Sequence, residues 1–135
     1  MARWSGWIAV ALMVAAALVP LFVRVRDGRR ANLESRPVAT HVIVGMTAAG
    51  LGFLHPLTAL FALGSPGAIG GGVLGLALGG LAFVVLLSHS GIGLKLRDPK
   101  LKRRSESRSR HLVTATLVTT LALAHAVACI VGRSR

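Results

Sequence analysis

The chain has 135 residues, of which 53% are hydrophobic and 15% are charged, and its formal net charge is +12. This length allows one domain, and the apolar residues fall in long blocks rather than in the alternating pattern of soluble domains. The composition therefore indicates an all-α integral membrane protein. Nucleic acid is not an expected partner despite the positive charge, because the most basic loop lacks aromatic residues that could stack on bases.

Four apolar blocks approach the length of a membrane-spanning helix, at residues 7–23, 38–63, 68–87 and 112–131. They predict a single transmembrane domain over residues 1–135, folded as a four-helix bundle. The first block could instead be a signal peptide, because Arg3 precedes an apolar run that contains consecutive alanines. The arginines directly behind this block favour a retained, membrane-spanning segment.

Two loops, residues 24–37 and 91–110, carry most of the charge. The first holds five and the second eight of the 16 Lys and Arg residues, and together they hold all four acidic residues. The positive-inside rule places both loops in the cytoplasm, where anionic lipid headgroups are their expected partners. The second and fourth helices are then expected to run parallel, with both termini outside, and a bacterial inner membrane is the expected location.

Two of the blocks repeat one histidine spacing. His41 and His55 are fourteen positions apart, and so are His111 and His125. Fourteen residues make nearly four helical turns, so each pair lies on one helix face at two levels about 21 Å apart. No single metal ion can bind both members of such a pair. In parallel helices, however, His41 is level with His111 and His55 with His125, which predicts two axial pairs for two haem groups.

The residues between these histidines on the same face are small, as a porphyrin between two helices requires. Those predicted to line the cofactors are Gly45, Gly52, Ala115 and Ala122. Stripes of small residues also occur at ordinary contacts between membrane helices. Histidines inside a membrane are less common, and their repeated spacing favours a role as ligands.

Other polar residues carry secondary predictions. Arg110, next to His111, is predicted to pair with a haem propionate. The second nitrogen of each ring is expected to bind a carbonyl one turn back, or a hydroxyl such as that of Thr58 or Thr114. His89 is interpreted as a cap or surface residue at the end of the third helix, with a proton or quinone contact as its functional alternative. Without a C-x-x-C-H motif, covalent haem attachment is excluded.

Two parallel helices, each with His-x13-His inside a four-helix bundle, resemble the haem-binding core of cytochrome b in quinol–cytochrome c oxidoreductases. More loosely, they resemble the membrane domains of ferric reductases and NADPH oxidases. The resemblance covers the whole chain at the level of helices, but only His41, His55, His111 and His125 carry it. It implies two stacked haem b groups that pass electrons across the membrane. The chain is much shorter than those proteins and has no flavin or nicotinamide domain and no recognisable quinol-site motif.

The sequence thus predicts a small di-haem membrane cytochrome that conducts electrons between an inner and an outer partner, each a quinone or a redox protein. It would be an electron-transfer protein or redox subunit rather than a stand-alone catalyst. The alternative is a non-haem structural or anchoring subunit of a larger complex or homo-oligomer, in which the histidines hydrogen-bond between helices. A transporter receives little support, because the four acidic residues all lie in the loops.

Overall fold

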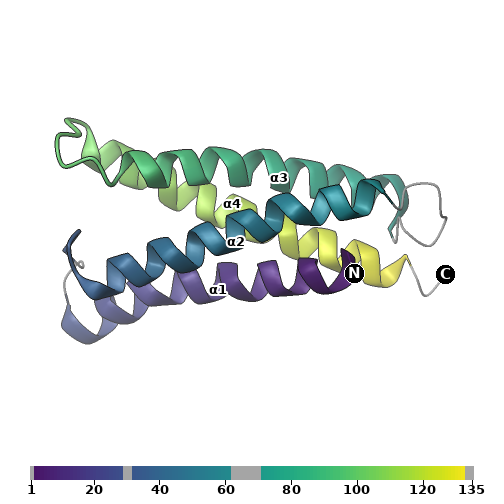
Figure 1. Ribbon diagram of the computed structural model, residues 1–135, viewed down its shortest axis with the longest axis horizontal. Helices are drawn as coiled ribbons and strands as arrows, with labels where there is room; N and C mark the ends of the chain where they lie inside the picture. The colour runs from purple at the N-terminus through teal and green to yellow at the C-terminus, as the bar shows by residue number, and fades with distance from the viewer. Residues whose placement is uncertain (1, 29–31, 62–70, 133–135) are drawn as a thin grey trace.

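The computed structural model describes residues 2–28, 32–61 and 71–132. In these ranges the regular structure is entirely helical, and four helices follow one another along the chain (Figure 1). They are α1 (Ala2–Asp27), α2 (Arg36–Leu60), α3 (Gly72–Lys95) and α4 (Arg104–Val131). Each is long and apolar enough to cross a membrane. The expectation of an all-α membrane protein with four helices is therefore confirmed.

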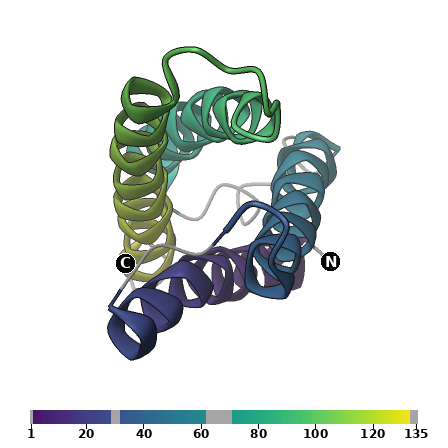
Figure 2. The ribbon, with the colours of Figure 1, turned by 90° about the vertical axis from the view of Figure 1, so that its left-hand side faces the viewer.

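The helices pack as two hairpins. The most extensive contacts join α1 to α2 and α3 to α4, whereas the contacts of α2 with α3 and of α1 with α4 are fewer. Viewed from one end, the four helices form a ring in which α2 and α4 lie diagonally opposite each other (Figure 2). Side chains that project from α2 and α4 towards the centre of the ring can therefore meet there.

Several positions of the first hairpin correspond to positions of the second at one constant offset. Helices α1 and α3 begin 70 positions apart, at Ala2 and Gly72. The same offset relates the buried residues near the middle of the bundle, which are Ala16 with Leu86 and Ala48 with Val118. It also relates the two histidine pairs. An offset of 70 positions thus relates the histidines and these buried residues of one hairpin to those of the other.

The exterior of the bundle is strongly apolar. Large side chains such as Trp4, at 73% exposure, and Val73, at 85%, face outwards, and no described polar side chain is buried. Exposed apolar surface costs roughly 25 cal/mol per Å² in water but is at home among lipid tails. This distribution is that of an integral membrane protein, in which most large apolar side chains face outwards rather than into the interior.

Glycine allows the α3–α4 hairpin to close tightly at its far end. Gly71, which precedes α3, has a φ of +97°, a conformation that side chains disfavour. A Cβ there would lie 2.8 Å from the carbonyl oxygen of Ala128 on α4. Any larger residue would therefore push these two helices apart. Residues 64–67, which separate the second and third predicted blocks, lie outside the described residues.

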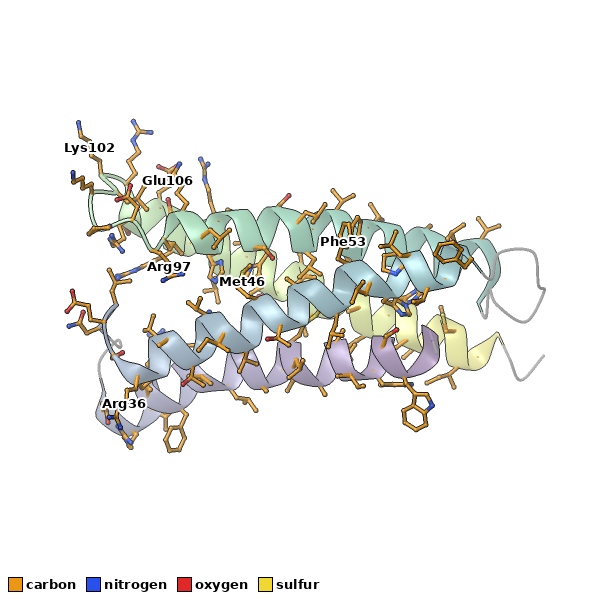
Figure 3. All side chains as sticks on the ribbon, viewed as in Figure 1. Arg36, Met46, Phe53, Arg97, Lys102 and Glu106 are labelled. Carbon is orange, nitrogen blue, oxygen red and sulfur yellow. The ribbon has the colours of Figure 1, made fainter. Side chains whose placement is uncertain are left out.

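The charged end of the bundle differs from the sequence-based expectation. Both α3 and α4 extend beyond the predicted apolar blocks, so residues 91–95 and 104–110 are helical rather than part of a loop. The short connection is held by the Arg104 guanidinium, which donates to the carbonyls of Leu96, at 2.8 Å, and of Asp98. Charged side chains, among them the labelled Arg97 and Lys102, gather at this end (Figure 3). A helix outside the lipid needs no apolar residues, so hydropathy could not predict these turns.

Candidate functional site: two facing histidine groups

The helices bring the four histidines together in two pairs across the bundle. The ring centroids of His41 and His111 are 6.1 Å apart, with an angle of 86° between the ring planes. The centroids of His55 and His125 are also 6.1 Å apart, at an angle of 73°. We call the first cluster, with the nearby His89, the His41 group, and the second cluster the His55 group. Each pair joins α2 to α4, as the spacing predicts.

Hydrogen bonds to neighbouring helices orient one ring of each pair. Nδ1 of His41 donates to the carbonyl of Ala16 on α1 at 2.8 Å, and Nδ1 of His125 donates to the carbonyl of Gly75 on α3 at 2.7 Å. A carbonyl can only accept, so the proton of each neutral ring resides on Nδ1. Nε2 then carries the lone pair that a metal ion requires.

The prediction that the rings bind carbonyls one turn back on their own helix is wrong, because for His41 and His125 the acceptor belongs to an adjacent helix. A ring aimed at the bundle centre cannot turn back to its own backbone, whereas the adjacent helix runs beside it. His55 follows the same rule, because its Nδ1 lies 3.2 Å from the hydroxyl of Ser5 on α1. The expected hydroxyls of Thr58 and Thr114 donate instead to the backbone carbonyl of the nearby histidine.

Glycines on the adjacent helices provide space for three of the rings. A Cβ on Gly6 would lie 3.0 Å from Cε1 of His55, and one on Gly79 would lie 3.0 Å from Cε1 of His125. A Cβ on Gly93 would lie 3.1 Å from Cε1 of His111. These distances are shorter than ordinary carbon contacts of about 3.5–4.0 Å, so a larger residue would displace the ring. Sequence reasoning missed all three glycines, because their role depends on how the helices are aligned.

His89 does not occupy the position expected from the sequence. The interpretation of His89 as a terminal cap or surface residue is wrong, because α3 continues to Lys95 and the ring is half-buried. Its ring stacks on that of His111, with centroids 4.0 Å apart and planes 12° apart. Its Nδ1 lies 3.0 Å from the hydroxyl of Thr114. The His41 group therefore contains a third imidazole, which the His55 group lacks.

The four small residues predicted to line the cofactors are half-buried, as are the histidines. A Cβ added to Gly45 would meet nothing within 4 Å, whereas one on Gly52 would lie 2.6 Å from Cδ2 of Leu86. Gly52 thus accommodates a neighbouring leucine, while Gly45 adjoins open space. Ala115 and Ala122 lie four and eleven positions after His111, on the face between the two histidines of α4.

In this structure the Arg110 side chain is engaged with a carboxylate, whereas the sequence predicted that it pairs with a haem propionate. Its side chain is exposed, and its guanidinium lies 2.5 Å from the carboxylate of Glu106, one turn earlier on α4. A propionate would have to compete with this carboxylate for the guanidinium. Pairing of Arg110 with haem stays a prediction.

Paired imidazoles are the metal-binding chemistry that this arrangement offers. Among the residues that the structure describes, no three His, Cys, Asp or Glu side chains gather in a way that could hold a metal ion. Cys129 adds a sulfur 3.8 Å from Nε2 of His125, at the edge of the His55 group. Zinc sites in proteins use at least three protein ligands, whereas haem iron needs only two axial ligands because the porphyrin supplies the others.

Comparison with known proteins finds no match: no family model, no curated protein sequence and no solved structure matches the chain.

Proposed function

We propose that this protein is a b-type di-haem membrane cytochrome, with one haem held by His41 and His111 and the other by His55 and His125. The observation that carries the proposal is the separation of 6.1 Å between the ring centroids in both pairs. An imidazole nitrogen lies about 1.1 Å from its ring centre, and metal–imidazole bonds are about 2.0 Å long, so two trans axial rings have centroids about 6.2 Å apart. Both pairs have this spacing.

The surroundings of the rings support the same proposal. Imidazoles that ligate metals commonly donate their second N–H to a carbonyl, which fixes the ring and raises its basicity. The bonds of His41 to Ala16 and of His125 to Gly75 have this form. Gly6 and Gly79 leave the space that the rings of His55 and His125 occupy.

Haem supplies one-electron redox chemistry when bound. The chain would hold the two irons at levels about 21 Å apart along α2 and α4, according to the helical rise between their histidines. Ala48 and Val118, which are 2% and 4% exposed, are each midway in sequence between the two histidines of their helix. They would keep water out of the region between the two haems, in which a low dielectric tunes the potentials.

The proposed topology follows from the charges. Lys and Arg concentrate in the two connections at one end of the bundle, which we assign to the cytoplasm. The pairing of His41 with His111 and of His55 with His125 supports parallel α2 and α4, with the His41 group on the inner side and both termini outside. In a bacterial inner membrane, electrons would pass between a quinone or redox protein at one face and a partner at the other.

The hydrogen bonds of His41 and His125 also fit a second function, that of a structural subunit. Nδ1 of His41 and Nδ1 of His125 already tie adjacent helices together through carbonyls on α1 and α3. A non-haem structural or anchoring subunit of a larger complex would use its histidines in this way. In that case the rings would serve as interhelical hydrogen-bond donors, and Nε2 would bind no metal.

A reduced-minus-oxidised absorbance spectrum of the purified protein, with a haem-to-chain ratio, separates the two functions. We expect bands of b-type haem and two haems per chain. A variant in which His41, His55, His111 and His125 are all alanine is the control for haem that adheres non-specifically, and it should be colourless. A colourless parent protein, after purification with haem supplied during expression, would favour the structural subunit.

A further inference from the structure

Nδ1 of His111 differs in its hydrogen bonding from Nδ1 of the other three proposed ligands. Those of His41, His55 and His125 each have a hydrogen-bonding partner on a neighbouring helix. Nδ1 of His111 is buried and has no hydrogen-bonding partner. A buried polar atom without a partner costs about 1–3 kcal/mol, so another interaction must hold this ring in place.

The ring of His89 provides that interaction. It lies on α3 and stacks almost parallel to the His111 ring, at 4.0 Å between centroids. Gly93, one turn later on α3, leaves room for Cε1 of His111. Two successive turns of α3 thus adjoin the His111 ring. His89 stacks on its face, and Gly93, which has no side chain, leaves space for Cε1.

His89 is itself held by a defined hydrogen bond. The hydroxyl of Thr114 donates its only proton to the carbonyls of Arg110 and His111, at 3.0 and 3.1 Å. Towards His89 this hydroxyl must therefore accept, so Nδ1 of His89 donates to it across 3.0 Å. Thr114 lies three positions after His111 on α4. Its hydrogen bond therefore ties the His89 ring of α3 to α4, the helix that carries His111.

We propose that His89 is a positioning residue that sets the plane of the His111 imidazole by stacking, in place of the hydrogen bond that orients the other three rings. The significance for haem rests on the proposed function. A ligand that makes no hydrogen bond through Nδ1 is less basic than one that does, and it stabilises ferric iron less. A haem held by the His41 group would therefore have the higher reduction potential of the two.

The test compares His89→Ala, which removes the stacked ring, with His89→Phe, which keeps an aromatic ring but no nitrogen. Ser88→Ala is the matched control, because Ser88 is the neighbouring residue, is exposed and donates only to the Val84 carbonyl of its own helix. The protein is used as purified from membranes. Two signals are recorded: the electron paramagnetic resonance spectrum of ferric haem, which reports the angle between axial imidazole planes, and the nuclear magnetic resonance shifts of the His111 ring.

We expect one of the two haem signals to broaden or shift in His89→Ala and to return in His89→Phe, while the other haem signal stays unchanged in all variants. Ser88→Ala should match the parent. If His89→Ala leaves both signals unchanged, or alters both equally, His89 does not position His111. A colourless parent protein would overturn the proposed function separately. The His111 ring shifts then decide the positioning role, because stacking shields this ring in the parent and in His89→Phe but not in His89→Ala.

Discussion

The His55 group and the His41 group have the same separation between their facing rings, but the rings are held in different ways. In the His55 group, each ring has a hydrogen-bonding partner for Nδ1 and an adjoining glycine on the adjacent helix. For His55 these are Ser5 and Gly6 on α1. For His125 they are Gly75 and Gly79 on α3. In the His41 group, Nδ1 of His41 and Nδ1 of His89 each have a partner, whereas Nδ1 of His111 has none and this ring stacks on His89. The repeated histidine spacing thus gives two unequal sites, because α3 offers the Gly75 carbonyl to His125 and the His89 side chain to His111.

The largest expected effect that separates the groups comes from Gly79→Val. The new Cβ would lie 3.0 Å from two atoms of the His125 ring and would displace it from its hydrogen bond to Gly75. Overpacking of this kind costs about 1–3 kcal/mol. We expect the haem of the His55 group to be lost, so that the haem-to-chain ratio falls from two to one.

Gly80→Val is the matched control for Gly79→Val. Gly80 is the next residue, and a Cβ there would meet nothing within 4 Å. The control introduces the same side chain into the same helix and should keep both haems. Equal haem loss in the two variants would mean that valine disturbs α3 in general rather than the His125 ring.

Gly93→Val is the corresponding change for the His41 group and should have a smaller effect. A Cβ there would lie 3.1 Å from Cε1 of His111 but 3.7 Å from its Nδ1, and this ring has no hydrogen bond through Nδ1 to lose. We expect both haems to bind, with a shifted reduction potential for one of them in a redox titration. Gly91→Val, where a Cβ would meet nothing within 4 Å, should leave both potentials unchanged.

Ser5→Ala should weaken the His55 group without emptying it. The change removes the hydroxyl that lies 3.2 Å from Nδ1 of His55. Loss of such a supporting hydrogen bond commonly lowers metal affinity by about 10–100-fold, and the lower end is expected here because the distance is long. The rate of haem transfer to a haem-free globin measures the change. An unchanged rate would show that Ser5 does not support the ligand.

The topology can be tested by labelling single cysteines. Cys129 is replaced by alanine, and single cysteines are introduced as Ser105→Cys and Phe61→Cys, at opposite ends of the bundle. Both residues are exposed, so a label can reach them. In intact cells, a membrane-impermeant thiol reagent should label Phe61→Cys and spare Ser105→Cys. The reverse pattern would place the His41 group at the outer face while leaving the pairing of the histidines intact.

The sequence predicted the features that depend on one helix at a time. The fourteen-residue spacing placed His41 and His55 on one face of α2, and hydropathy located four spans, because both are properties of a single segment. The turns beyond Leu87 and before His111 were missed, since polar and charged residues interrupt the apolar pattern there although the helices continue.

The supports of the site could not be predicted in the same way. Helix α3 contains many glycines, and only its alignment with α4 determines that Gly75 and Gly79 meet His125. The same applies to Ser5 and Gly6 on α1. His89 was misread because its role depends on the distance to His111 on another helix rather than on its place near the end of an apolar block.

Two double variants test whether His41 pairs with His111 and His55 with His125 across the bundle. His55→Ala with His125→Ala removes both ligands of one proposed site and should leave one haem per chain. His41→Ala with His55→Ala removes one ligand from each site and should leave none. The haem-to-chain ratio is measured in monodisperse material, because an empty cavity also lowers stability. If the first variant also lost both haems, as crossed pairs of His41 with His125 and of His55 with His111 would, the histidines would pair differently and the proposed sites would be wrong.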